Sequence, residues 1–310
     1  MGKTIVVALG GNALIRPGQK GTASEQLANL EAVTEQLAHL HNRGFRIVLT
    51  HGNGPQVGAL LVQQEKARDY APQMPLYVCV AESQGLIGYF LQEALYNKLR
   101  RRGFNIPVVT VLTQVLVSRE DKAFQSPSKP IGPTFHSDTG LPRNWHLTRT
   151  IKGFRRVVPS PRPKRIIEGE EIRHISRSSI VIACGGGGIP VVQDRGLRGV
   201  EAVIDKDLSA ALLARAVGAD TLAILTDVDF VYLNYRKPSQ KKLARVTAEQ
   251  LKGHYEEGHF PPGSMGPKVQ AALHFLRWGG KKALITSLER LEDAVNGEWG
   301  TMIEHTKTKK

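Results

Sequence analysis

Three lysines stand apart because each lies among Gly, Pro or Asp residues and not on a regular helix face. They are Lys129, Lys206 and Lys268. Lysine carries a compact positive charge on a flexible stem, which suits the binding of phosphate oxygens. The carboxylates of Asp205 and Asp207, on either side of Lys206, could hold its ammonium in place. An isolated lysine is ordinarily solvent-exposed, so the phosphate-binding hypothesis depends on what accompanies these three.

Glycine-rich turns follow three of the predicted strands. Their residues are 10–12 (Gly-Gly-Asn), 52–54 (Gly-Asn-Gly) and 185–188 (four glycines). Ligands of a doubly wound sheet collect at the carboxyl ends of its strands, and glycine lets backbone N–H groups approach a phosphate closely. One such pair indicates only an ordinary turn. Three together favour an anion-binding site.

Two common nucleotide motifs are missing from the sequence. The chain has no G-x-x-x-x-G-K-[ST] of the P-loop, and no strand-embedded G-x-G-x-x-G with a well-placed acidic residue. A P-loop enzyme is therefore excluded, and dinucleotide binding is disfavoured. If the protein handles phosphate, the lysines must supply the electrostatic stabilisation.

Strands and helices alternate along both halves of the chain, which predicts an α/β fold with a largely parallel sheet. A helix is expected to begin near Thr22, because Thr22 and Glu25 have the spacing of a capping box, and to end at Gly44. The predicted strands cover residues 5–9, 47–50, 108–112, 180–183, 221–225 and 283–286. The other predicted helices cover residues 83–101, 207–217 and 267–278.

Residues 113–178 differ in composition from the rest of the chain and are predicted to form an inserted subdomain. The segment holds 7 of the 17 prolines, and its 13 Lys and Arg outnumber its 6 Asp and Glu. The prolines exclude long helices, while Phe124, Ile131, Phe135, Trp145 and Phe154 could form a small core. A structureless loop is the alternative, although such long loops are uncommon in compact domains. Residues 1–112 and 179–310 would then form the core.

The net charge of +14 raises the possibility of nucleic-acid binding. No nucleic-acid-binding module is recognisable, however, and the basic residues are not interleaved with aromatic ones. An enzyme that handles ATP and a small anion explains the excess of lysine better. We therefore expect no nucleic-acid partner.

A cytoplasmic protein without a membrane partner is expected. The first residues lack the apolar run of a signal peptide, and no apolar run reaches the length that spans a bilayer. Cys79 and Cys184 lie far apart in apolar sequence and are interpreted as reduced core residues.

The histidines and tryptophans receive mostly structural interpretations. His51 adjoins the turn at residues 52–54 and could be a general base, although a structural hydrogen-bonding role is favoured. No zinc site is expected, because five other histidines lack ligand spacing: His136, His146, His174, His254 and His259. The three tryptophans are interpreted as packing residues.

Taken together, these segments resemble the carbamate kinase family, within the amino acid kinase superfamily. The resemblance runs from residue 5 to about 303, in the family's order and spacing. It is carried by residues 8–14 (ALGGNAL), 50–58 (THGNGPQVG), 82–89 (ESQGLIGY), 129–133 (KPIGP), 155–161 (RRVVPSP), 184–190 (CGGGGIP), 199–207 (GVEAVIDKD), 225–229 (LTDVD) and 263–268 (GSMGPK).

The resemblance implies an open αβα sandwich with a protruding lid subdomain. The part at about 1–178 would bind the acceptor and the part at about 179–310 the nucleotide. The acceptor and phosphate site would include Gly10, Gly11, Asn12, Gly52, Asn53, Gly54 and Ser83. The nucleotide site would include Gly185, Gly186, Gly187, Gly188, Thr226, Asp227, Val228, Tyr232, Met265 and Pro267.

The resemblance also implies the chemistry: reversible phosphoryl transfer between ATP and carbamate, giving ADP and carbamoyl phosphate, in arginine metabolism. Lys206 and Lys268 would contact the transferring oxygens, Lys129 the acceptor, and Asp207 would orient the lysines. Mg²⁺ would be held mainly by the nucleotide, not by protein side chains. A homodimer is implied as well, with the helix after Ser83 as a contact.

Two departures from the superfamily pattern affect these expectations. Many superfamily kinases have a catalytic lysine in the first strand, where this chain reads Val7-Ala8-Leu9, so Lys129 or Lys206 must supply that charge. This favours carbamate over acetylglutamate, aspartate or uridylate as acceptor. In addition, the segment from Thr134 to Gly153 is shorter than expected. Its contribution to lid closure is therefore left open.

Two alternatives remain at this point. One is another kinase of the superfamily with a different small acceptor, since the acceptor pocket determines specificity. The other is a non-catalytic, ligand-binding regulator on the same fold, since fold alone does not determine function. The presence of all three lysines disfavours the regulator.

Overall fold

An eight-stranded sheet forms the centre of the protein. The computed structural model describes residues 2–143, 145–150 and 153–306. All neighbouring strands of the sheet are parallel except the pair β16 and β17. Its order is β15 (Arg245–Thr247), β17 (Thr301–Glu304), β16 (Lys282–Ser287), β12 (Thr221–Thr226), β1 (Thr4–Leu9), β2 (Arg46–His51), β9 (Ile180–Ile182) and β3 (Val108–Thr110).

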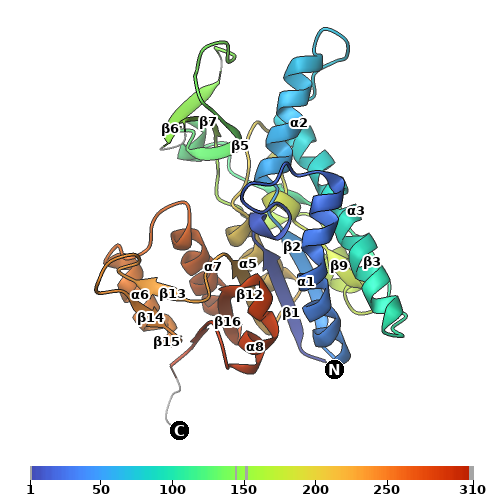
Figure 1. Ribbon diagram of the computed structural model, residues 1–310, viewed down its shortest axis with the longest axis vertical. Coiled ribbons are helices and arrows are strands. Elements are labelled where there is room, and N and C mark those ends of the chain that lie inside the picture. The colour runs from blue at the N-terminus through green and yellow to red at the C-terminus, as the bar shows by residue number, and fades with distance from the viewer. Residues whose placement is uncertain (1, 144, 151–152, 307–310) are drawn as a thin grey trace.

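Helices cover both faces of this sheet, because its central strands are apolar on both sides. Along β1, Ile5 and Val7 pack into one core, whereas Val6 and Ala8 pack into the other. The first core contains residues of α1 (Ala23–Asn42), α3 (Leu76–Arg101) and α8 (Leu291–Asn296). The second contains residues of α4 (Gly169–Ile175), α5 (Lys206–Ala216), α6 (Ala248–Glu256) and α7 (Met265–Arg277). The predicted αβα sandwich is confirmed (Figure 1).

The helix predicted from the capping box is present. Thr22 accepts a hydrogen bond from the Glu25 amide, the Glu25 carboxylate accepts from the Thr22 amide, and Gly44 follows with a φ of +81°. Helix α3, by contrast, begins at Leu76 and not at residue 83. Its first turns pack Leu76 and Cys79 into a separate small core, so their apolar spacing does not continue the stripe further along the helix.

Helix α2 (Gly54–Ala67) was not predicted. It begins directly after the turn at residues 52–54, with Pro55 in its first turn, and it buries only Gln56, Val57, Gly58 and Leu61. So narrow a buried face leaves little helical periodicity in the sequence.

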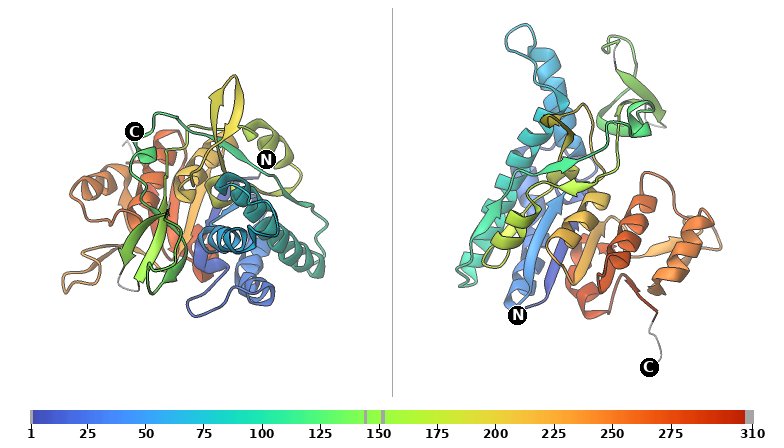
Figure 2. Two further views of the ribbon diagram at one scale, coloured as in Figure 1. Left: turned by 90° about the horizontal axis from the view of Figure 1, so that it is seen from above. Right: turned by 180° about the vertical axis from the view of Figure 1, so that it is seen from behind.

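Residues 113–178 contribute to two different sheets. Strands β5 (Lys129–Phe135), β7 (Gly153–Val158) and β6 (His146–Thr150) form an antiparallel sheet that projects from the body beside α2 (Figures 1 and 2). Strands β4 (Gln114–Leu116) and β8 (Arg165–Ile166) instead pair with β10 (Ile189–Asp194) and β11 (Gly196–Gly199). The limits of the lid as a domain remain a prediction, and we call β5, β6 and β7 the projecting sheet.

The projecting sheet approaches α2 at two glycines. A Cβ atom on Gly58 would lie 1.8 Å from the Cα atom of Gly132, whose φ is +70°. Only residues without a side chain permit this backbone contact. It joins the projecting sheet to the helix that follows the turn at residues 52–54.

Two further expectations concern the cysteines and membrane-spanning helices. Cys79 and Cys184 are both buried and free, as predicted. Within the described residues, no helix is both long enough and apolar enough to cross a membrane.

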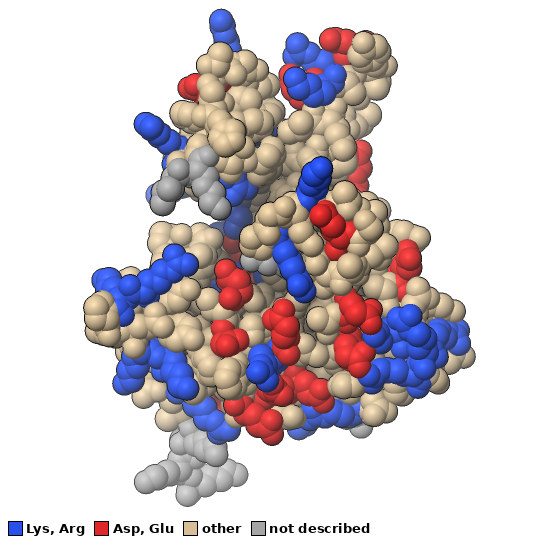
Figure 3. Space-filling view, in the orientation of Figure 1, with Lys and Arg blue, Asp and Glu red and all other residues tan. Residues whose placement is uncertain are grey.

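Basic and acidic side chains are mixed on the face drawn in Figure 3. Lys and Arg lie mainly on the projecting parts and the flanks, and Asp and Glu lie between them. The described Lys and Arg residues therefore form no continuous stripe on this face, of the kind that follows a nucleic-acid backbone.

Candidate active site

The start of helix α5 organises the first of the three lysines. Asp205 is the N-cap residue, and its Oδ1 atom accepts a hydrogen bond of 2.9 Å from the Asp207 amide. Its Oδ2 atom accepts a bond of 2.6 Å from Nζ of Lys129. One carboxylate thus stabilises the helix N-terminus and fixes an ammonium that comes from β5. The sequence suggested Asp205 as a partner of Lys206, but the structure pairs it with Lys129.

The other two lysines meet at Asp207. Nζ of Lys268 lies 3.0 Å from Oδ2 of Asp207, and Nζ of Lys206 donates to Oδ1 of the same carboxylate. The Asp207 side chain is 5% exposed. The structure therefore connects all three lysines to one short segment, residues 205–207. Three ammonium groups face two carboxylates there, which leaves an excess of positive charge.

The protonation of this cluster follows from burial and pairing. Burial would raise the pKa of Asp207, but the charges of Lys206 and Lys268 outweigh it and hold that pKa well below its ordinary value. Burial lowers the pKa of Lys206, against the opposing charge of Asp207. Burial acts on Lys268 as well, but there the attraction of Asp207 prevails and the pKa is raised. Lys268 is thus the firmly charged member, and the charge of Lys206 depends on Asp207.

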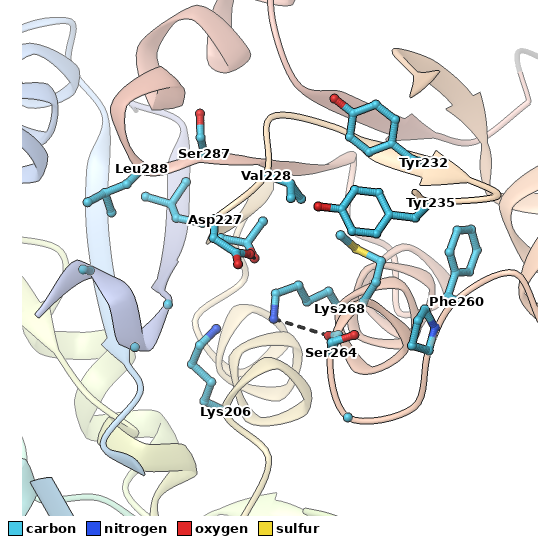
Figure 4. A pocket seen from close by; sticks show the side chains of 18 of the residues that line it. Lys206, Asp227, Val228, Tyr232, Tyr235, Phe260, Ser264, Lys268, Ser287 and Leu288 are labelled. Atoms are coloured by element: carbon cyan, nitrogen blue, oxygen red, sulfur yellow. Dashed lines mark hydrogen bonds between the residues drawn. The ribbon is translucent and has the colours of Figure 1, made fainter. Parts of the chain in front are cut away.

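Lys206 and Lys268 line a cavity of about 620 Å³, a size typical of small-molecule sites. In Figure 4 their ammonium groups lie toward one end of the pocket, near Asp227, whereas the rings of Tyr232 and Tyr235 lie toward the other. The centroids of these two rings are 5.7 Å apart. One end can therefore receive anionic groups, and the other offers aromatic surface for a planar ring.

The first two glycine turns lie next to Lys206. Gly10 and Gly11 follow β1 and line the pocket. A Cβ atom on Gly52, which follows the adjacent strand β2, would lie 3.5 Å from the Gly11 nitrogen and 3.6 Å from Cδ of Lys206. The parallel pairing of β1 with β2 thus brings both turns and the lysine to one edge of the sheet, the edge at which ligands of such sheets collect.

The four-glycine turn, which is predicted to bind the nucleotide, follows β9. The residues from Gly185 to Gly188 are buried and do not line the 620 Å³ pocket. A Cβ atom on Gly186 would lie 2.1 Å from Nδ2 of Asn53, which donates a 2.8 Å hydrogen bond to Oγ of Ser83. This turn therefore packs against the predicted acceptor residues, because β9 lies beside β2 in the sheet.

His51 occupies a buried position at the end of β2. It is 1% exposed, and its Nδ1 atom lies 3.0 Å from the Gly52 carbonyl oxygen. Burial lowers the pKa of His51 to about 4. A neutral, enclosed imidazole agrees with the structural role favoured from the sequence.

Most of the remaining predicted nucleotide residues border the pocket: Thr226, Asp227, Val228, Tyr232 and Met265. Pro267 lies in the first turn of α7 and does not line it, and Gly54 begins α2. The side chain of Asn12 lies outside the described part of the structure. Several lining residues were not singled out from the sequence: Arg16, Tyr235, Arg236, His259, Phe260 and Glu289.

An unusual backbone conformation marks Tyr235 and Arg236 as candidate site residues. They lie in the turn that joins β13 (Val231–Leu233) to β14 (Lys241–Leu243), where Asn234 and Arg236 have φ values of +49° and +62°. Non-glycine residues in this conformation are uncommon and concentrate at functional sites. Backbone angles are not readable from sequence, so the signal appears only in the fold.

At the end of the pocket where the ammonium groups of Lys206 and Lys268 lie, the side chains fit a magnesium ion that is held mainly by phosphate oxygens. Asp227 and Glu289 are the carboxylates that line the pocket, whereas Asp207 is occupied by two ammonium groups. Mg²⁺ usually binds one or two carboxylates together with substrate phosphates and water. In the described part of the chain, no cage of three carboxylate or imidazole ligands surrounds Lys206 and Lys268.

Comparisons with known proteins agree on one family. The model of the amino acid kinase family matches residues 3–287. The carbamate kinase of Thermococcus kodakarensis is 47% identical over 97% of this chain and 99% of its own length. Carbamate kinase 1 of Enterococcus faecium is 48% identical, over 94% and 95% respectively. A solved carbamate kinase from Giardia lamblia, bound to AMP-PNP, superposes with a TM-score of 0.92 at 41% identity, covering 98% of this chain and 99% of that one.

Proposed function

The chain belongs to the carbamate kinases of the amino acid kinase family, and from this premise we propose that it transfers a phosphoryl group reversibly between ATP and carbamate. A carbamate oxygen forms a bond to the γ-phosphorus, and the bond from that phosphorus to the β–γ bridging oxygen breaks. The products are ADP and carbamoyl phosphate. The observation that carries this proposal is the convergence of Lys129, Lys206 and Lys268 on residues 205–207.

Phosphoryl transfer needs positioning and charge stabilisation more than covalent help from the protein. Lys206 and Lys268 neutralise the transferring oxygens, and Asp207 holds both ammonium groups in place before substrate arrives. Because the side chains of Lys206 and Lys268 are already paired and largely buried, little reorganisation is needed during the reaction. Mg²⁺, bound with the nucleotide, supplies further positive charge at the phosphates.

The acceptor is proposed to bind between the turn at residues 52–54 and the projecting sheet. Lys129 comes from β5 of that sheet, its side chain is 31% exposed, and its ammonium is held by Asp205. Lys206 lies beside Gly52 and lines the pocket together with Gly11, so it supplies the positive charge for which the first strand has no lysine. This arrangement supports a small acceptor such as carbamate.

The direct test is the synthesis of ATP from ADP and carbamoyl phosphate by the purified protein with Mg²⁺. We expect Lys206→Ala and Lys268→Ala each to lower turnover about 100-fold or more, the scale of losing one preorganised donor. Lys281→Ala is the control, because Lys281 is 73% exposed and pairs with Asp220. Near-normal turnover in both active-site variants would remove the phosphate-site assignment. If the purified protein phosphorylated acetylglutamate or aspartate instead of carbamate, that compound would have to replace carbamate as the assigned acceptor.

A homodimer formed through α3 is also proposed. Leu86, Tyr89 and Tyr96 are 38%, 60% and 45% exposed, and their spacing places them on one side of the helix. Large apolar side chains gathered on one exposed face favour a protein interface. Sedimentation of the purified protein measures the oligomeric state, and a monomer at all concentrations would contradict this proposal.

A further inference from the structure

Two histidines and a glutamate come together at the end of α6, although no zinc site was expected from their sequence spacing. They are His254, Glu257 and His259. The structure brings one potential ligand atom of each within 4.8 Å of the others. We propose that these three residues form a binding site for a transition-metal ion of the Zn²⁺ class, separate from the Mg²⁺ that accompanies the nucleotide.

The backbone explains why residues five apart become neighbours. At the end of α6 the Gly258 amide donates to the Tyr255 carbonyl, and the His259 amide donates to the His254 carbonyl. Gly258 has a φ of +79°. These two bonds and the left-handed glycine define a Schellman motif, in which the first and last residues approach each other. The contact between these positions of a Schellman motif is frequently apolar, but here it joins two imidazoles, whose ring centroids are 5.6 Å apart.

The side-chain geometry suits a metal ion. Nδ1 of His254 lies 3.2 Å from Oε2 of Glu257, and Nε2 of His259 lies 3.3 Å from the same oxygen. Ligands about 2.1 Å from a tetrahedral Zn²⁺ are separated from each other by about 3.4 Å. The two distances to Glu257 already match this separation, and the two nitrogens, which lie within 4.8 Å of each other, would need to approach by at most about 1.4 Å.

The ligand types decide which ion is favoured. Two imidazoles with one carboxylate suit Zn²⁺ and its transition-metal neighbours, whereas Mg²⁺ prefers oxygen ligands alone. Three protein ligands leave a tetrahedral ion one position for water or another ligand. The side chains of His254 and His259 are 30% and 26% exposed, so an ion can reach them from solvent.

The site would brace one wall of the nucleotide pocket. His259 and the next residue, Phe260, line the pocket, and the segment that follows leads into α7 and Lys268. An ion that ties His259 to α6 would hold this segment against the helix. The proposed function does not require this ion, so binding can be tested without nucleotide.

The experiment is a titration of the chelator-treated, full-length protein with Co²⁺ and Zn²⁺ in an excess of Mg²⁺, without nucleotide. Co²⁺ reports imidazole ligation by its visible absorption, and Zn²⁺ is followed by calorimetry and by displacement of Co²⁺. We expect one ion per chain. His254→Gln and Glu257→Gln should each weaken binding at least about 10-fold, since even the loss of an outer partner of a metal ligand has that effect.

The matched control is His39→Gln. His39 also contacts two carboxylates, with Nδ1 2.8 Å from Glu292 and Nε2 3.5 Å from Glu35, but it lies on α1. Binding should be unchanged in this variant. The proposal is overturned if the protein binds no Co²⁺ or Zn²⁺, or if both His254→Gln and Glu257→Gln bind as tightly as the unmodified protein. Glu257 is 62% exposed, so its variant tests the site even if His254→Gln does not fold.

Discussion

Replacement of Asp207 by asparagine tests how the lysine cluster works. The variant keeps the size of the side chain but removes the negative charge that Lys206 and Lys268 share. Two buried ammonium groups would then repel each other with no carboxylate between them. Breaking a buried ion pair from one side costs about 3–5 kcal/mol of folding free energy, so we expect destabilisation on that scale at neutral pH.

The pH dependence of Asp207→Asn is the more specific signature. Burial already lowers the pKa of Lys206, and Asp207 is the largest influence that opposes it. Removing the opposite charge of Asp207 lowers the pKa of the Lys206 ammonium further. Lys206 must be protonated to neutralise phosphate, so the alkaline limb of the pH–rate profile should move to lower pH. Turnover at the optimum should fall about 100-fold or more.

The sign of the stability effect can be checked independently. The pKa of Asp207 is depressed in the folded protein. Its contribution to the free energy of unfolding is therefore present at pH values above the ordinary aspartate pKa and is lost as the pH falls toward its lower pKa in the folded state. The stability difference between Asp207→Asn and the unmodified protein should therefore shrink in acid.

The assay is ATP formation from ADP and carbamoyl phosphate, measured across pH, together with urea unfolding. Asp194→Asn is the control, because Asp194 pairs with Arg119 at 3.4 Å on the exposed surface and should change neither quantity. The reasoning is refuted if Asp207→Asn retains normal turnover with an unmoved alkaline limb.

Three further predictions concern the surroundings of the cluster. Lys129→Ala should raise the KM for carbamoyl phosphate about 10-fold or more and leave the KM for ADP nearly unchanged, as expected for a lost charged hydrogen bond to the acceptor; equal effects on both would contradict its placement. Burial lowers the pKa of His51 to about 4, so the free energy of unfolding should fall by about 3 kcal/mol as the pH falls from about 6.5 to 4. His51→Gln should abolish this part of the pH dependence, measured by urea unfolding. Gly58→Ala should force the backbone away from Gly132 and cost about 1–3 kcal/mol in thermal unfolding. Gly253→Ala, in α6 and with no atom within 4 Å of the added Cβ, should not destabilise.

Local patterns in the sequence predicted much of the fold, because they describe interactions between residues close along the chain. The capping box of Thr22 and Glu25 involves residues three apart, and it placed the start of α1 correctly. Helix α2 escaped prediction for the same reason: its buried face is narrow and its packing partner, the projecting sheet, comes from a distant segment. The start of α3 was missed because its first turns pack into a different core.

The sequence by itself determined which residues could act on phosphate. The three lysines, Asp207 and the glycine turns were recognisable from residue type and neighbours, and the order of the motifs indicated the family. What it could not determine is how distant residues pair. Lys129 meets Asp205 across 76 positions, Lys268 meets Asp207 across 61, and the turn at 185–188 packs against Asn53. Those contacts depend on the order of strands in the sheet, and strand order emerges only when the whole chain packs.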